Sequence, residues 1–117
     1  MTYIENVQAV LDAVAEPRRR AILTLVRDRE LAAGAIAAQF PDVARPTVSQ
    51  HLRVLRDAGL VVERRVGTSR LYRTRPEGFA EVREFLDGFW ADRLQTLKTE
   101  AEREQRIRDG RGRTRRP

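Results

Sequence analysis

Residues 45–60 constrain the fold most, because they read as one short amphipathic helix with defined ends. The apolar side chains recur at helical spacing, at Val48, Leu52 and Leu55. Pro46 suits the first turn of a helix, and Gly59 suits the C-terminal end, where the backbone often turns left-handed. The stretch therefore predicts a helix that packs one side against a core and exposes the other.

The exposed side of this predicted helix is polar and basic. It carries two hydroxyls, an amide and three guanidiniums, on Arg45, Thr47, Ser49, Gln50, Arg53 and Arg56. Such groups bind base edges and phosphates in the major groove of DNA. We expect the hydroxyls and the amide to read bases and the arginines to contact phosphates.

The flanking segments predict a helix-turn-helix followed by a hairpin. Apolar periodicity predicts helices over residues 3–14, from Pro17 to about Arg27, and over residues 31–40. Strands are predicted over residues 60–65 and 70–74, because both stretches are rich in β-forming residues and flank a turn. The two strands form a hairpin whose basic tip is the wing. We expect DNA contacts in the wing from Arg65, Thr68, Ser69 and Arg70. The predicted fold class is mainly α with a small β-hairpin, a winged helix-turn-helix.

A long helix is predicted from residue 77 to about residue 105. Four of the seven aromatic residues fall on it, and an apolar stripe of this length exceeds what so small a domain covers alone. We therefore expect it to be a dimerisation helix, with intramolecular packing as the alternative. The predicted homodimer interface consists of Val7, Val10, Leu11, Phe79, Val82, Leu86, Phe89, Trp90, Leu94 and Leu97.

Positive charge is concentrated in one part of the chain. Residues 45–75 carry eight arginines and two acidic residues. The net charge of this segment is therefore +6, which equals the net charge of the whole sequence. This placement favours double-stranded DNA as a partner over a uniformly solvated basic surface. Residues 1–107 are predicted to form the DNA-binding and dimerisation domain, and residues 108–117 a disordered, arginine-rich tail.

Two further features have a structural and a functional interpretation. Arg18, Arg19 and Arg20 are either solvated or in contact with phosphates. The single histidine, His51, lies on the flank of the apolar stripe, where a partly buried hydrogen bond is more common than a contact with DNA or metal.

The composition excludes several classes of function. Without cysteine the chain has no disulfide, thiolate metal site or thiol switch, and with one histidine we expect no metal and no cofactor. No nucleophile–base pair or glycine-rich phosphate loop is present, so we do not expect an enzyme. No apolar run reaches membrane-spanning length and no signal peptide is recognisable, which predicts a cytoplasmic protein without membrane contact.

Three segments resemble a known family. "AVAEPRRRAILTLV" (13–26), "RPTVSQHLRVLRDAGLVVERRVGTSRLYR" (45–73) and "FWADRL" (89–94) are similar to the ArsR-type winged-helix repressors of bacteria. The resemblance implies a homodimer built by the first and last helices, whose recognition helices enter successive major grooves of an inverted repeat about 34 Å apart. By this resemblance Thr47, Ser49, Gln50 and Arg53 match positions on the family's recognition helix, and residues 65–70 match its wing.

The sequence departs from the metal-sensing members of that family. One metal site of those members uses cysteines at positions that align with Ala32 and Gly34 here. Their other metal site uses pairs of Asp and His on the last helix, which in this sequence has Asp87 and Asp92 but no histidine. The resulting hypothesis is a metal-independent dimeric repressor, which regulates its own gene among its targets. Two alternatives are a winged-helix protein-interaction module and a small-molecule-responsive regulator with an aromatic pocket at the dimer interface.

Overall fold

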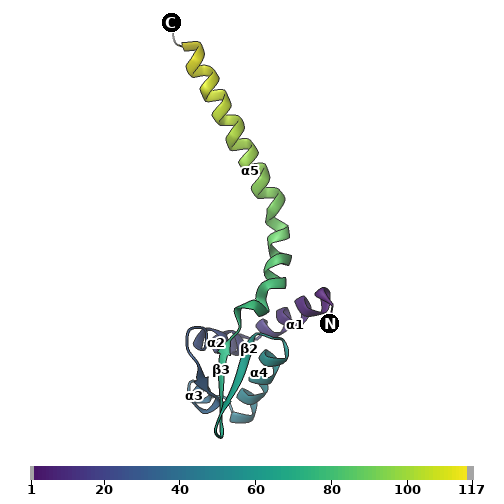
Figure 1. Ribbon diagram of the computed structural model, residues 1–117, viewed down its shortest axis with the longest axis vertical. Helices are drawn as coiled ribbons and strands as arrows, with labels where there is room; N and C mark the ends of the chain where they lie inside the picture. Colours follow the sequence, from purple (N-terminus) through teal and green to yellow (C-terminus); the bar gives the residue numbers. More distant parts are fainter. Residues whose placement is uncertain (1, 116–117) are drawn as a thin grey trace. The chain divides into compact units, whose positions relative to one another are not determined.

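The computed structural model describes the backbone of residues 2–115 and the side chains of residues 2–93 and 95–110. Its elements are α1 (Tyr3–Val14), α2 (Pro17–Leu25), β1 (Leu31–Ala32), α3 (Ala33–Ala38), α4 (Arg45–Asp57), β2 (Val61–Val66), β3 (Ser69–Thr74), the 3-10 turn η1 (Pro76–Phe79) and α5 (Ala80–Arg115) (Figure 1). The chain up to Arg83 forms one compact unit, and the part from Glu84 onward forms a second.

The fold of the first unit confirms the predicted winged helix-turn-helix. α3 and α4 are joined by a short turn, and the hairpin β2–β3 follows α4 directly and packs against α2, α3 and α4 (Figure 1). The core is formed by apolar residues of these elements and of α1, among them Ile22, Ile36, Leu55 and Leu60, which are fully buried. The predicted stripe of α4 is buried as well, since Val48 and Leu52 are each 2% exposed.

The third predicted helix is shorter than expected at its N-terminal end. Leu31 and Ala32 form a strand, which makes the sheet three-stranded with the order β1-β3-β2, and α3 begins only at Ala33. In this sheet Leu31 lies opposite Tyr72 and Ala32 lies opposite Leu71, both in antiparallel register. The prediction was wrong here because pairing with the open edge of β3 satisfies the backbone of these two residues.

Two glycines are required by the backbone next to the hairpin. Gly67 adopts a φ of 60° in the turn between β2 and β3, a conformation that side chains with a Cβ disfavour. A Cβ on Gly78 in η1 would lie 2.1 Å from the carbonyl oxygen of Gly59, so no side chain fits there. η1 therefore passes in close contact with the backbone that ends α4.

The last helix starts and ends later than predicted. Residues 76–79 form a 3-10 turn, and α5 runs from Ala80 to Arg115, about ten residues beyond the predicted end. Arginine is a good helix former, and hydrogen bonds four and three residues apart support the extension, from Gln105 Nε2 to Asp109 and from Arg108 Nη2 to Gln105. The division into residues 1–107 and a tail 108–117 stays a prediction, and residues 116–117 lie outside the described part.

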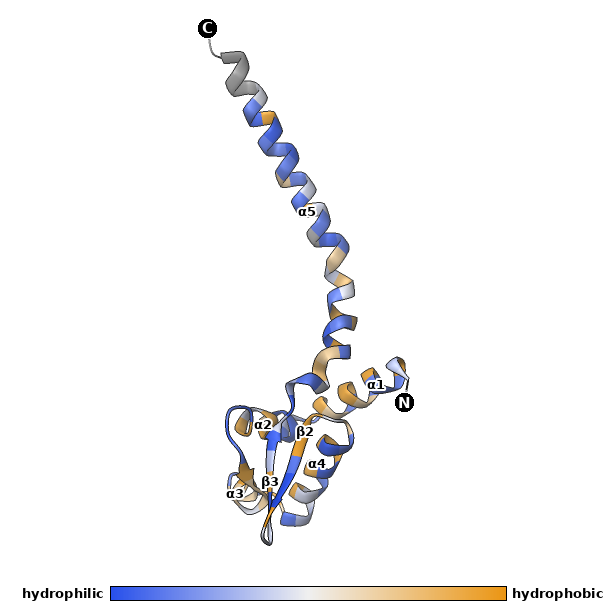
Figure 2. Cartoon of the chain, viewed as in Figure 1, coloured by the Kyte–Doolittle hydropathy of each residue, from blue (hydrophilic) through white to orange (hydrophobic). Residues whose placement is uncertain are grey.

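Apolar residues of α5 are concentrated towards its N-terminal half, as Figure 2 shows. Large apolar side chains there are exposed in the single chain, namely Phe85, Leu86, Phe89, Trp90 and Leu97. The rings of Phe85 and Phe89 meet edge to face, with centroids 5.2 Å apart. Among the described residues, no helix has the length and hydropathy needed to cross a membrane.

Candidate nucleic-acid interface

The exposed face of α4 carries all six side chains that the sequence predicted on it. Arg45, Thr47, Ser49, Gln50, Arg53 and Arg56 are exposed. Arg45 and Pro46 lie in the first turn after the N-cap Ala44, and Gly59 with a φ of 77° follows the C-terminal end. Burial of the opposite stripe fixes the rotation of the helix, so these polar groups point outward together.

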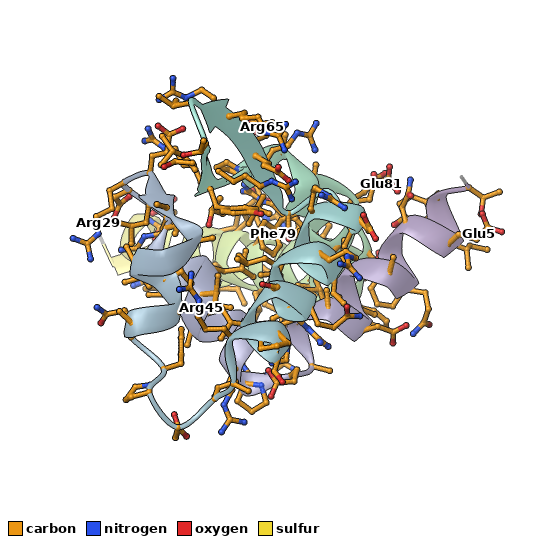
Figure 3. All side chains as sticks on the ribbon, turned by 90° about the horizontal axis from the view of Figure 1, so that it is seen from below. Glu5, Arg29, Arg45, Arg65, Phe79 and Glu81 are labelled. Atoms are coloured by element: carbon orange, nitrogen blue, oxygen red, sulfur yellow. The ribbon has the colours of Figure 1, made fainter. Side chains whose placement is uncertain are left out.

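The hairpin presents a second basic face. Side chains alternate along strands, and the register places Arg65 opposite Arg70 and Glu63 opposite Tyr72 on one side of the sheet. Tyr72 is buried, and β2 contacts α4, so this is the side that faces α4, the recognition helix of the predicted helix-turn-helix. Thr68 and Ser69 are exposed at the turn. Figure 3 labels Arg65 on the hairpin and Arg45 on α4.

Glu63 connects the two basic faces. Its Oε2 accepts a hydrogen bond of 3.0 Å from Nη1 of Arg56, and its Oε1 lies 3.5 Å from Nε of Arg70. The hydrogen bond with Glu63, assisted by the charge of Asp57, raises the pKa of the Arg56 guanidinium above its ordinary value. The carboxylate therefore orients one arginine of the helix and one of the wing.

Gln50 and Arg53 form a pair on the outer face of α4. Nη1 of Arg53 donates to Oε1 of Gln50 at 3.1 Å. Because arginine only donates, the amide must turn its oxygen to Arg53, and its NH₂ group is left to face outward. The two residues thus form one hydrogen-bonding unit.

The same architecture is found in known regulators. Residues 14–64 match a family profile described as a helix-turn-helix domain. The HTH-type transcriptional regulator Rv2034 of Mycobacterium tuberculosis is 46% identical over 82 residues, which cover 70% of this chain and 76% of that protein. The solution structure of the homodimeric winged helix-turn-helix DNA-binding domain Mb0332 from Mycobacterium bovis, a possible ArsR-family transcriptional regulator, is 34% identical with a TM-score of 0.60 and covers 74% of this chain and 79% of that one.

The chain belongs to the ArsR family of winged helix-turn-helix transcriptional regulators. Transcriptional repressor SdpR of Bacillus subtilis is also similar, with 36% identity over 58 residues that cover 50% of this chain and 63% of SdpR. The resemblance predicted from the motif at residues 45–73 is therefore confirmed.

In this ArsR-family chain the three clustered arginines of α2 have structural partners. Arg19 donates from Nε to the carbonyl oxygen of Ala13 at 2.7 Å, and Arg20 donates from Nη1 to that of Val14 at 2.6 Å. These carbonyls belong to the last turn of α1, where carbonyl oxygens have no backbone N–H partner within the helix. Arg18 forms an ion pair of 3.2 Å with Asp42.

His51 is partly buried, as predicted for this histidine in the ArsR-family chain. Its Nδ1 lies 3.4 Å from Nη1 of Arg19, and its Nε2 lies 3.9 Å from Oε2 of Glu16. Desolvation opposes ionisation of Glu16, but the backbone N–H of Arg19 and the charge of His51 outweigh it and lower the pKa of Glu16. His51 therefore belongs to a polar cluster that joins α4 to the start of α2.

The opposite side of the hairpin holds an ion pair that sequence reasoning missed. Arg64 in β2 donates from Nε to Oε2 of Glu30 at 3.0 Å, and its Nη2 donates to Oε1 at 2.6 Å. This contact lowers the pKa of Glu30 and raises that of Arg64. Glu30 immediately precedes β1, and β3 lies between β1 and β2 in this ArsR-family sheet. The ion pair therefore links the start of β1 to β2 across β3.

The residues predicted for a dimer interface differ in their exposure in the single ArsR-family chain. Val7, Val10 and Val82 are buried in its own core, which leaves little of their surface for a partner. Phe79 is half-buried, whereas most of the others are exposed, namely Leu11, Leu86, Phe89, Trp90 and Leu97. The side chain of Leu94 lies outside the described part.

Proposed function

We propose that this protein is a homodimeric transcriptional repressor that binds an inverted-repeat operator without needing a metal ion. The observation that carries the proposal is the exposed face of α4, whose polar and basic side chains stand beside the basic face of the hairpin. Occupation of the operator then blocks transcription sterically, including that of its own gene. The similarity to the repressor SdpR supports this direction of regulation.

Contacts with DNA are divided by chemistry. Thr47, Ser49 and Gln50 read base edges, since hydroxyls and amides both donate and accept hydrogen bonds. Arg53, Arg56 and the wing bind phosphates, and this part of the affinity falls steeply with salt. The protein then behaves as a DNA-binding module and not as an enzyme, and it acts in the cytoplasm.

Dimerisation relies on the exposed apolar residues of α5 and of α1. Isolated exposed apolar residues are common, but five large ones within residues 85–97 form a set that single soluble chains rarely expose. The homodimeric state of the similar Mb0332 domain supports the same assembly here. Two identical recognition helices require an operator with two related half-sites.

The dimer is tested by Trp90→Arg. We expect this substitution to convert the dimer to a monomer in sedimentation equilibrium, because it places a charge in an apolar contact. Thr99→Arg is the control, since nine residues at 100° per residue put it on the opposite side of the helix. A dimer that withstands Trp90→Arg would contradict an interface built on this part of α5.

Metal independence is supported by the residues present. Ala32 and Gly34 stand at the positions that hold cysteine in the metal-sensing proteins that the sequence resembles, and neither has a metal-ligating side chain. Binding is therefore expected to be equal in EDTA and in added zinc. Release of DNA by zinc at micromolar concentration would disprove this part of the proposal.

The DNA-binding function itself is tested with duplexes selected from a random library by the full chain. We expect an enriched inverted repeat, bound at least about a thousandfold more tightly than random duplex at physiological salt. The second candidate, a protein-interaction module, predicts that no sequence is enriched and that binding to all duplexes is equally weak. A duplex from the region upstream of its gene checks autoregulation.

A further inference from the structure

A groove of about 290 Å³ lies between the start of α3, the start of α4 and the tip of the hairpin. It is lined by Ala32, Ala33, Gly34, Arg45, Thr68, Ser69 and Arg70. These residues come from three segments that are distant in sequence. The groove therefore exists only because the recognition helix and the wing are packed on the same short third helix.

The chemistry of the groove suits a tetrahedral oxyanion. Arg45 and Arg70 bring two guanidiniums, and Thr68 and Ser69 bring two hydroxyls, whereas no carboxylate is among its described lining residues. Guanidiniums and hydroxyls are the usual side-chain ligands of phosphate oxygens. Across the described side chains, no ion pair compensates the charge of Arg45.

Arg70 is already oriented on its inner side. Its Nε lies 3.5 Å from Oε1 of Glu63, so the planar guanidinium is held from that edge. A ligand in the groove then meets the remaining N–H groups of a side chain whose position is partly fixed.

Gly34 permits the position of Arg45. A Cβ on Gly34 would lie only 3.3 Å from Nη2 of Arg45, so the guanidinium rests against the glycine. Glycine is a poor helix former, but in the first turn of α3 it gives the guanidinium more room than a residue with a Cβ would. The small residues at 32–34 thus leave room for a charged group.

We propose that this groove clamps one backbone phosphate in each half-site of the operator, between Arg45 of the recognition helix and Thr68, Ser69 and Arg70 of the wing. The inference rests on the proposed DNA-binding function and deepens it. A phosphate held by both the helix and the wing fixes where the recognition helix enters the major groove of the DNA. It therefore sets the register in which the bases are read.

The test combines single methylphosphonate substitutions in a selected duplex with variants of the full chain. In the wild type we expect one position per half-site at which removal of the phosphate charge weakens binding about tenfold. At that same position the substitution is expected to cause a smaller loss in Arg45→Gln and in Arg70→Gln than in the wild type, and no further loss in the double variant. The double variant should lower the slope of log affinity against log salt by about 0.9 per half-site, as for one phosphate.

Each alternative outcome has a distinct meaning. If the two variants respond to different methylphosphonate positions, or the double variant lowers the slope by about 1.8 per half-site, two separate contacts exist and the inference is wrong. If the wild type binds no selected duplex at all, the proposed function fails instead. Free inorganic phosphate that shifts the amide signals of Gly34 and Ser69, with no methylphosphonate position that depends on Arg45, would assign the groove to a soluble oxyanion and overturn the DNA contact.

A pair of substitutions separates the groove from the stability of α3. Gly34→Ala favours the helix but crowds Arg45, so we expect weaker DNA binding, by about threefold to tenfold, without a lower melting temperature. Ala35→Gly disfavours the same helix at an exposed position outside the groove, so we expect a lower melting temperature with unchanged binding. Equal DNA affinities of the two variants would contradict the role of Gly34.

Discussion

Nη1 of Arg56 in α4 donates a hydrogen bond of 3.0 Å to Oε2 of Glu63 in β2, across the junction of the recognition helix and the wing. The same carboxylate lies 3.5 Å from Nε of Arg70. Glu63 is thus an acid in the middle of a basic surface, and its side chain is only 19% exposed. It holds the two guanidiniums in place and, under the proposed function, competes with DNA for them.

Glu63→Gln is expected to shift the balance from specific to non-specific binding. Without the carboxylate, Arg56 and Arg70 lose their contact with Glu63 and are more available to any phosphate, so affinity for random duplex should rise about threefold to tenfold at low salt. The ratio of specific to random affinity should fall, because the arginines lose their orientation. Fluorescence anisotropy at two salt concentrations measures both quantities.

The control for this substitution is Glu77→Gln, an identical change at an exposed position in η1. It should leave both affinities nearly unchanged. The folding free energy is expected to change by less than about 1 kcal/mol in either variant, since partly exposed ion pairs contribute little. A Glu63→Gln protein with wild-type affinity for both duplexes would show that the two arginines do not contact DNA.

Gln50 and Arg53 are expected to act as one unit in specificity. The sequence alone predicts that Gln50→Ala relaxes base preference, whereas Arg53→Ala weakens binding to all sequences. The 3.1 Å hydrogen bond between them modifies this prediction, because Arg53→Ala also releases the amide of Gln50. A double-mutant cycle on the selected duplex should therefore give a coupling free energy of about 0.5–2 kcal/mol. Additive losses would mean that each side chain contacts DNA independently.

The elements that the sequence predicts well are those whose pattern is local. α1 begins and ends at the predicted residues, Tyr3 and Val14, because apolar residues recur along it at helical spacing. β1 was missed because two residues carry no periodicity, and their strand conformation depends on pairing with Leu71 and Tyr72, about forty residues away. Long-range pairing of this kind leaves no trace in the local pattern.

The same limit applies to the candidate interface. Exposure of the six polar residues on α4 follows from the buried stripe, and the periodicity predicts both. The role of Glu63 follows only from the hairpin register, which sets it diagonal to Arg70 on one face of the sheet. Burial of Val7 in the chain's own core was also beyond the sequence, since periodicity shows that a residue is covered but not by which partner.

Glu30 is expected to make stability depend on pH in the acidic range. Arg64 lowers the folded-state pKa of Glu30 below its ordinary value of 4.5, so the folded protein binds fewer protons there than the unfolded chain. The stabilisation is complete above the ordinary pKa and is lost as the pH falls through the folded-state value. Glu30→Gln should therefore lower the melting temperature at about pH 7 and lower it less at about pH 3.

Asp28→Asn serves as the control for this pH dependence. Among the described side chains Asp28 pairs only with the neighbouring Arg27, and its side chain is 79% exposed, compared with 28% for Glu30. We expect it to change the melting temperature little at either pH. A deficit of Glu30→Gln that is equal at both pH values would show that the ion pair with Arg64 does not contribute.

Arg19 is expected to stabilise the fold and not to bind DNA. Its guanidinium donates to the carbonyl oxygens of Ala13 and Asp12 in the last turn of α1, and Arg19→Ala removes both of these hydrogen bonds. We expect a loss of about 1–3 kcal/mol in the free energy of unfolding, measured in urea, with unchanged affinity for the selected duplex. Arg18→Ala removes only the exposed pair with Asp42 and should cost less than about 1 kcal/mol. If Arg19→Ala instead weakens DNA binding while stability is kept, the arginine cluster of α2 contacts phosphates, which is the alternative that the sequence left open.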